Sequence, residues 1–249
     1  MRNVGTLILF LFFFVYSFGQ IKNGIQEKEG AWIRGDINQK IIFLCFTAHD
    51  FMEGLPFVLN TLNNEKVKAS FFLTGDFVRN HPALTNEIYN NKHYVGAHSD
   101  KHLLYCDWEK RDSLLVSLSD IKQDLWNNIN ELSALGIPKN ATSIFMPPYE
   151  WYNKEIAAQV PSWGFTLINF TPGTSSNADY TTPDKKNYLS SDTILHRIIN
   201  YERQNPHGLN GFYLLMHVGT DPQRTDKFYF QLPKLIQFLK SKGYSFGRF

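Results

Sequence analysis

Five side chains that can bind a metal ion or transfer a proton follow three apolar segments of the chain. His49 and Asp50 follow IIFLCFTA, His98 and His102 follow YVGA, and His217 ends the run YLLMH. His98 and His102 are four residues apart, so a helical turn would put both imidazoles on one face. Together with a carboxylate such as Asp50, they would form a three-ligand metal site with one position open for water. His217 is a candidate general acid or base, because imidazole titrates near neutral pH.

The elements that must position these side chains follow from the hydrophobic pattern. Runs of strand length alternate with segments of helical period. The expected strands are Ile41–Thr47, Ala69–Thr74, Tyr94–Ala97, Ser143–Met146, Phe165–Phe170, Phe212–His217 and Ser245–Phe249. The expected helices are Leu55–Asn64, Pro82–Asn91, Leu114–Leu135, Lys154–Gln159, Asp192–Glu202 and Phe230–Lys242.

This alternation predicts an α/β fold with a parallel sheet covered by helices. The number of units favours a closed or nearly closed barrel, with a doubly wound sheet as the alternative. Functional groups gather at the carboxyl ends of the strands in either architecture, which would place the five side chains at one rim. In the long helix, Asp112 or Ser113 is expected at the N-cap, and Gly136 with Pro138 is expected to end it.

The composition is that of a globular protein without a polybasic segment. The chain has 249 residues, 43% of them hydrophobic and 19% charged, with a formal net charge of +2. This length fits one large domain or two small ones, and the charge gives no reason to expect a nucleic-acid partner.

The first nineteen residues have the pattern of a secretory signal peptide. Arg2 precedes the apolar run LILFLFFFVYSF, and small residues precede a cut near Gly19 or Gln20. The alternative is an uncleaved anchor, but the run is shorter than the ~20 apolar residues of a bilayer span. We therefore expect a secreted or periplasmic protein without a stable membrane anchor. In such a compartment Cys45 and Cys106 could form a disulfide or remain as two buried thiols.

Aromatic and polar residues near the expected strand ends are candidates for substrate binding. The stretch FMPPYEWY has a stiff backbone because of its two prolines, and its Tyr149, Trp151 and Tyr152 could stack on a sugar ring or cap the barrel core. The candidate substrate-binding residues are Tyr149, Glu150, Trp151 and Leu215. The long loop FTPGTSSNADYTTPDKKNY is either a functional rim loop or a surface insertion.

Three segments carry a resemblance to a known family. They are KASFFLTGDFVRNHP at 68–82, the H-[ST]-x-x-H pattern from His98 to His102, and the L-x-H pattern from Leu215 to His217. From about Ile41 to its C-terminus, the chain resembles the polysaccharide deacetylases of carbohydrate esterase family 4, the NodB-homology domain. The resemblance implies a distorted (β/α) barrel, with residues 20–249 as one catalytic domain.

The resemblance also implies roles for individual residues. Asp50, His98 and His102 would hold a divalent metal ion, which is most commonly zinc in the family. His217 would protonate the leaving group, and the partner would be an acetylated poly- or oligosaccharide.

Three motifs depart from the family pattern. His49 stands where the family has an aspartate as general base. The family motif R-P-P-[YF] is replaced by Met146-Pro147-Pro148-Tyr149, so the arginine that pairs with that base is missing. The Asp and Trp of the fourth motif have no clear match in the region of Asn169-Phe170-Thr171-Pro172.

These departures leave the identity of the base open. His49 could itself be the catalytic base, because neutral imidazole can accept a proton. It could instead be a fourth metal ligand or a packing residue, with Glu150 or Asp221 as the base. Glu150 occupies a position where the family often has glycine.

The predicted function is a secreted, metal-dependent deacetylase that removes N- or O-linked acetyl groups from a carbohydrate by metal-activated water. The changed motifs support an alternative, a catalytically impaired carbohydrate-binding protein of the NodB type. Hydrolysis of a different amide or ester is a third hypothesis, because a fold does not fix the substrate.

Overall fold

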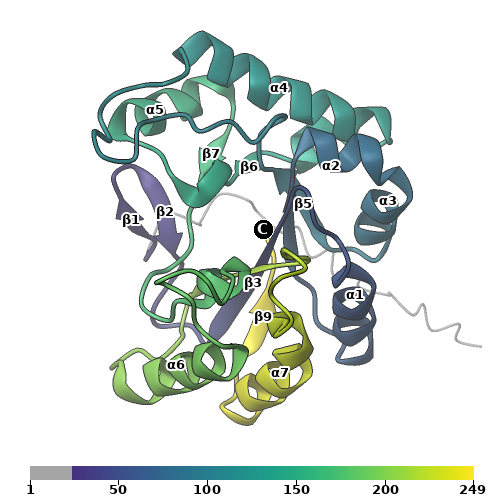
Figure 1. The fold of residues 1–249 in the computed structure, drawn as a ribbon, viewed down its shortest axis with the longest axis vertical. Coiled ribbons are helices and arrows are strands. Elements are labelled where there is room, and N and C mark those ends of the chain that lie inside the picture. Colours follow the sequence, from purple (N-terminus) through teal and green to yellow (C-terminus); the bar gives the residue numbers. More distant parts are fainter. Residues whose placement is uncertain (1–23) are drawn as a thin grey trace, which may run out of the picture.

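A curled parallel sheet forms the centre of the molecule. The structure is a computed structural model that describes residues 24–249. Within these residues a seven-stranded sheet has the strand order β7-β6-β5-β4-β3-β8, and β9 is also paired to β3. The strands are β3 Ile41–Ala48, β4 Ser70–Leu73, β5 Tyr94–Ala97, β6 Ile144–Phe145, β7 Thr166–Leu167, β8 Tyr213–His217 and β9 Ser245–Gly247. In Figure 1 the strands surround the middle of the view and the helices lie outside them. This arrangement confirms the predicted distorted (β/α) barrel.

A short antiparallel hairpin connects the two ends of this sheet. It consists of β1 (Gln26–Lys28) and β2 (Ala31–Arg34). Trp32 forms a bridge to Ile168 just after β7, and Arg34 forms a bridge to Phe212 just before β8. Because β2 reaches both edge strands, it nearly closes the barrel and covers edges that would otherwise expose unpaired backbone groups.

Each parallel strand buries side chains on both of its faces. On β3, Leu44 and Phe46 belong to the large apolar cluster that also contains the helix side chains, whereas Cys45 belongs to a smaller cluster with Met146 and Leu215. The buried members of the smaller cluster all come from strands or from residues adjoining them, so this cluster fills the barrel interior. Burial on both faces explains why the strands read as continuous apolar runs rather than as alternating patterns.

The helices cover the outside of the sheet. They are α1 Leu55–Asn64, α2 Gly75–Asn80, α3 Pro82–Asn90, α4 Leu118–Ala134, α5 Lys154–Gln159, α6 Ser191–Gln204 and α7 Leu232–Ser241. Short 3₁₀ segments occupy Lys139–Ala141, Pro148–Glu150, Val160–Trp163, Ser176–Tyr180 and Phe228–Gln231. None of the helices between residues 24 and 249 combines the length and the apolar character needed to span a bilayer.

The predicted elements are confirmed, with differences at some of their ends. Helix α4 begins at Leu118 rather than Leu114, because the Ser117 hydroxyl accepts the Asp120 N–H at 3.2 Å as its N-cap. Leu114 instead pairs with Cys106 in an isolated bridge, so neither Asp112 nor Ser113 is the cap. The helix ends before Gly136, whose φ of 83° suits glycine, as predicted. The elements β1, β2 and α2 were not predicted: QEK and AWIR carry no apolar run of strand length, and α2 follows β4 directly from the Thr74 cap.

Two expectations concern covalent processing. Cys45 and Cys106 are both buried free thiols in this structure, which favours the second of the two alternatives for them. The predicted signal peptide, residues 1–19, lies outside the described residues.

Candidate active site

The imidazoles of His98 and His102 meet just beyond the carboxyl end of β5. Their Nε2 atoms are 3.3 Å apart. His98 Nδ1 donates to the Met146 carbonyl oxygen at 2.9 Å, which leaves a lone pair on Nε2. Burial lowers the pKa of His98 to about 3 and that of His102 to about 2, and neighbouring imidazoles contribute to both shifts. Both rings are therefore neutral near pH 7, which is the form that binds metal ions.

His49 and Asp50 lie at the same rim but interact mainly with each other. The Thr74 hydroxyl accepts the Phe77 N–H at 3.1 Å and lies 3.1 Å from His49 Nδ1, so it can donate its own proton to that nitrogen. The His49 Nε2–H then faces Asp50 Oδ1 at 3.3 Å. The His49 ring also stacks on His102, with ring centroids 4.5 Å apart. The Asp50 side chain is 70% exposed and does not converge on the two metal-site histidines.

His217 is held by a buried carboxylate that the sequence did not reveal. Asp179 Oδ1 accepts His217 Nδ1–H at 2.6 Å, and Oδ2 accepts the backbone N–H of the same residue at 2.8 Å. Burial alone would lower the pKa of His217, but the charge and hydrogen bond of Asp179 outweigh it and raise the pKa above its ordinary value. His217 is thus prepared to carry a proton, as a general acid must.

Asp179 comes from the long polar loop after β7. It lies in the 3₁₀ segment Ser176–Tyr180, whose Tyr180 ring is 5.4 Å from the His217 ring. The loop therefore contributes to the rim, in agreement with the first of the two interpretations of it. No motif or spacing identified Asp179, because it is 38 residues from its partner and only the fold brings them together.

Glu150 places a second carboxyl group beside the histidines. Its Oε1 is 4.0 Å from His98 Nε2, and its side chain is only 10% exposed. Burial raises the pKa of Glu150 to about 7, the nearby His217 lowers it, and Asp179 raises it. The backbone is strained here, because Tyr149 and Glu150 have φ values of 57° and 53°. Such left-handed geometry costs about 1–2 kcal/mol for each non-glycine residue.

Aromatic side chains form an exposed surface next to these groups. Tyr149 is 45% exposed and Trp108 is 53% exposed, with ring centroids 5.7 Å apart. The Tyr149 ring lies 4.4 Å from that of His102, and Trp151 lies 5.2 Å from Trp108. Beside them is a cavity of about 220 Å³ whose lining includes Tyr149, Glu150 and Trp151. Tyr149, Glu150 and Trp151 therefore line one space, and their contact with a sugar stays a prediction. Tyr152 is only 1% exposed, so it packs in the core rather than stacking on a sugar.

The remaining candidate, Leu215, has a different environment. Leu215 is fully buried in the barrel interior beside Met146, the residue at the position of the family arginine. Its predicted contact with substrate stays a prediction. Met146 is also fully buried, so its side chain occupies apolar surroundings that would not suit an arginine without an anionic partner.

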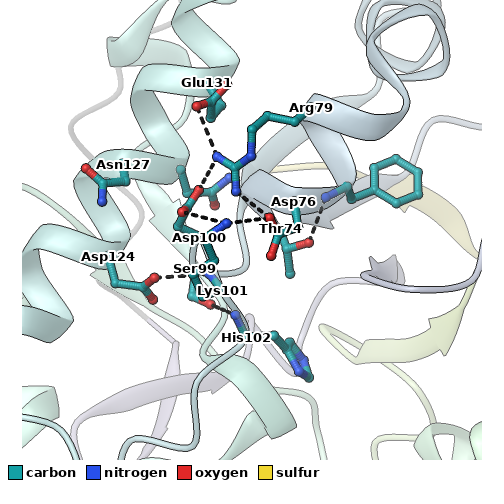
Figure 2. A network of polar contacts seen from close by, with 12 residues as sticks. Thr74, Asp76, Arg79, Ser99, Asp100, Lys101, His102, Asp124, Asn127 and Glu131 are labelled. Carbon is teal, nitrogen blue, oxygen red and sulfur yellow. Dashed lines mark hydrogen bonds and ion pairs between the residues drawn. The ribbon is translucent and has the colours of Figure 1, made fainter.

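A network of ion pairs fixes the loop that carries the metal-site histidines, as Figure 2 shows. Arg79 of α2 pairs with Asp100 of the loop at 2.7 Å, with Asp76 at 2.6 Å and with Glu131 of α4 at 3.0 Å. The loop packs closely on the start of α2, since a Cβ atom on Gly75 would lie 1.8 Å from Asp100 Oδ1. The network thus joins the loop to two helices.

Helix α4 also binds the loop backbone directly. The Asn128 side chain accepts the His98 N–H at 3.0 Å, and Asp124 accepts the Lys101 N–H at 3.0 Å. These bonds satisfy a segment in which His102 has a left-handed φ of 53°. They fix the direction in which the two imidazoles point.

The histidine pair fits a divalent metal ion. Two nitrogens bound to one tetrahedral zinc ion lie about 3.3 Å apart, given Zn–N distances of about 2.0–2.1 Å. The Nε2 atoms of His98 and His102 have this separation. No group of three His, Cys, Asp or Glu side chains among residues 24–249 is arranged to hold an ion. Asp50 as the third ligand therefore stays a prediction that requires its side chain to rotate.

Comparisons with known proteins agree with this architecture. The sequence pattern of the polysaccharide deacetylase family matches residues 34–168. The chain is 26% identical over 151 residues to the peptidoglycan-N-acetylmuramic acid deacetylase PdaA of Bacillus subtilis, a match that covers 60% of this chain and 54% of PdaA. The chain thus spans about half the length of that relative.

Two solved structures share the fold. The Bc1960 peptidoglycan N-acetylglucosamine deacetylase superposes with a TM-score of 0.70 at 21% identity, covering 87% of this chain and 89% of that one. The protein BA3943 of Bacillus anthracis, described as a carbohydrate esterase family 4 pseudoenzyme, gives a TM-score of 0.69 at 23% identity and covers 89% of this chain and 68% of its own. The family match, which extends over more than half of the chain, and the barrel together show that this chain belongs to the polysaccharide deacetylases of carbohydrate esterase family 4.

Proposed function

We propose that the protein is a secreted, metal-dependent deacetylase that removes acetyl groups from an acetylated polysaccharide. The observation that carries this proposal is the convergence of two neutral imidazoles, His98 and His102, at a rim that also holds the His217–Asp179 pair. Peptidoglycan is the first substrate class to test, because named relatives are peptidoglycan deacetylases.

In this proposal His98, His102 and Asp50 hold the ion, for which zinc is the leading candidate. A bound ion supplies a Lewis acid that polarises the acetyl carbonyl. The exposed rings of Tyr149 and Trp108 orient the sugar by stacking. Water attacks the carbonyl carbon and loses a proton to a base at the rim.

His217 completes the reaction by supplying a proton to the leaving nitrogen or oxygen as its bond to the acetyl carbon breaks. Asp179 keeps Nδ1 occupied and stabilises the imidazolium, so that Nε2 carries the transferable proton. The products are acetate and a free amine or hydroxyl group.

The test is acetate release by the zinc-loaded protein from N-acetylated peptidoglycan, chitin oligomers and O-acetylated xylan. Chelation should abolish release and zinc should restore it, and His217→Ala should lower the rate by about 10²–10⁴-fold, the usual contribution of a general acid. Full activity of the His217→Ala protein would disprove the role of His217. Unchanged activity after complete removal of metal would disprove the metal dependence.

A second candidate function is carbohydrate binding without turnover. The replacement of the usual aspartate and arginine by His49 and Met146 favours it, and one structural neighbour is described as a pseudoenzyme. Calorimetric titration of the zinc-loaded protein with the same glycans separates the two functions. Binding heat without acetate release would support the second function, whereas acetate release would rule it out.

A further inference from the structure

The proposed reaction needs a base, and the structure makes His49 a poor candidate for it. Both ring nitrogens of His49 have partners, Nδ1 with the Thr74 hydroxyl and Nε2 with Asp50. The Thr74 hydroxyl, 3.1 Å from His49 Nδ1, can donate its proton to that nitrogen and thereby occupy its lone pair. The ring would have to break this hydrogen bond before it could accept a proton from water.

Glu150 differs from His49 in the hydrogen bonds that its side chain makes. Within residues 24–249, no hydrogen-bond donor contacts either of its carboxyl oxygens, although the side chain is nearly buried. Neither carboxyl oxygen is among the fully buried atoms that lack a partner in the described part of the chain, so both can reach water at the rim. The carboxyl group is therefore available to a water molecule rather than engaged in holding the fold. Oε1 lies 4.0 Å from His98 Nε2, which is too long for a hydrogen bond but suits a group that acts through one water molecule.

The backbone conformation at Glu150 also favours a functional role for this residue. Its φ of 53° lies in the left-handed region, where glycine would fit without strain. Asn169 holds this conformation by donating from Nδ2 to the Glu150 carbonyl oxygen at 2.7 Å. Residues kept in strained conformations concentrate at functional sites, and here the strain directs a carboxyl group at the histidine pair.

The side chain also borders the space where a substrate would lie. Glu150 lines the cavity of about 220 Å³ together with Tyr149 and Trp151, the two aromatic residues beside the rim. Glu150 therefore borders this cavity, and its Oε1 lies 4.0 Å from His98 Nε2. This is the position that a base needs in order to reach a water molecule that attacks a bound acetyl group.

We propose that Glu150 is the general base of this enzyme and takes the place of the missing aspartate. Its carboxylate removes one proton from the attacking water as the water oxygen bonds to the acetyl carbon. His217 then gives its proton to the leaving atom as the bond between that atom and the acetyl carbon breaks. After acetate leaves, Glu150 releases its proton to solvent and His217 takes one up, which restores the starting state of both groups. This inference rests on the proposed function.

The test compares Glu150→Gln and Glu150→Gly in the zinc-loaded protein. Both variants should lose at least about 100-fold in acetate release, because each lacks the base. Glu150→Gly should also unfold at a higher temperature than the wild type, because glycine adopts the left-handed backbone without strain and no carboxyl group is buried. Formate, a small carboxylate that can enter the space left by the side chain, should restore part of the activity of Glu150→Gly but not of Glu150→Gln.

Two controls distinguish a general base from a metal ligand and from a general effect of lost charge. Glu155→Gln makes the same chemical change on the exposed surface of α5 and should leave acetate release unchanged. Zinc affinity of both Glu150 variants, measured by competition with a chelator, should stay within about threefold of the wild type. A loss above tenfold, the size expected when a group that supports a metal site is removed, would assign Glu150 to the metal site and overturn the proposal.

Two further outcomes would also count against it. Undiminished acetate release by Glu150→Gln, especially if His49→Gln is inactive, would return the base role to His49. A zinc-loaded wild type that releases acetate from none of the glycans would disprove the proposed function, and the role of Glu150 with it. The two failures are therefore distinguishable, because an active wild type together with an active Glu150→Gln variant disproves the role of Glu150 and leaves the proposed function intact.

Discussion

At the scale of single residues, the histidines of the candidate site have different pKa values because their surroundings differ. Burial keeps His98 and His102 neutral, whereas Asp179 raises the pKa of His217. One residue type is therefore suited to the two proposed roles, metal binding and proton donation, according to its neighbours. The sequence identified the three histidines, but it did not supply the carboxylate that makes His217 different from the other two.

The His217–Asp179 pair predicts a particular pH dependence. The Asp179→Asn variant removes the negative charge that raises the pKa of His217, so His217 should lose its proton at a lower pH. The alkaline limb of the profile of kcat/KM against pH should move down by at least about one unit, a typical effect of one close opposite charge. The measurement is acetate release from pH 5 to 10.

A control in the same loop tests whether this shift is specific. Asp184→Asn removes an exposed carboxylate that pairs with Lys185 and should leave the alkaline limb where it is. An unmoved limb in Asp179→Asn would show that the acid of the reaction is not a His217 tuned by Asp179.

At the scale of elements, α2 and α4 hold the loop that carries His98 and His102 (Figure 2). Helix α4 was predicted, but α2 was not, since its six residues depend on the Thr74 cap and on packing. The match of the segment KASFFLTGDFVRNHP to the family identified this region without revealing its helix. The position of the loop depends on contacts between elements that are more than twenty residues apart, which no local pattern contains.

The ion pairs that hold this loop should differ in their contributions to stability. Among residues 24–249, Arg79→Met leaves the nearly buried Asp100 with one weak ion-pair partner, Lys101 at 3.8 Å, and should lower the free energy of unfolding by about 3 kcal/mol. Lys101→Met removes the ion pair with the more exposed Asp76 and the long contact with Asp100, which keeps Arg79 at 2.7 Å, and should cost less than about 1 kcal/mol. Urea unfolding of the two variants and the wild type measures both effects. Equal losses in the two variants would contradict the distinction between buried and exposed pairs.

At the scale of the whole molecule, the barrel buries titratable groups away from the site as well as in it. His93, just before β5, is 3% exposed and accepts the Ala69 N–H on Nδ1 at 3.1 Å. Burial lowers its pKa to about 4, and the charges of Lys68 and Arg248 add to the effect. Folding is therefore linked to the neutral form of this ring.

This linkage predicts that the protein loses stability in mild acid. The unfolded chain binds a proton at His93 near pH 6.5 and the folded chain only near pH 4, so the contribution is complete above pH 6.5 and is lost as the pH falls between these values. The loss from His93 alone is about 3 kcal/mol by linkage. In the presence of a chelator, the urea midpoint of the wild type should fall between pH 7 and pH 4.5.

Two variants isolate the contribution of His93. His93→Asn can keep an acceptor for the Ala69 N–H without titrating, so its urea midpoint should fall less steeply over the same pH range. His196→Asn, on the exposed surface of α6, should show the same slope as the wild type. Parallel slopes for wild type and His93→Asn would contradict the linkage.

The alternation of strands and helices, the rim that gathers His49, His98 and His217, and the family can all be recognised in the sequence alone. These features are encoded locally, in runs of apolar residues and in short motifs, because strand and helix periods are properties of contiguous residues. The shared rim required no more than these runs, since parallel strands collect their carboxyl ends on one side in a barrel and in a doubly wound sheet alike. The choice of the barrel rests on the tertiary structure, in which β2 bridges the two edge strands.

The pairing of the groups at that rim, in contrast, emerges only in three dimensions. The fold brings Asp179 to His217 across 38 residues and turns Asp50 toward His49 rather than toward the metal-site histidines. It also gives Glu150 a buried, strained position, although in the sequence this residue was only one of several candidates for the base. Loop conformation and burial set these pairings, and both depend on contacts between distant segments, so they could not be predicted from residue types and spacing.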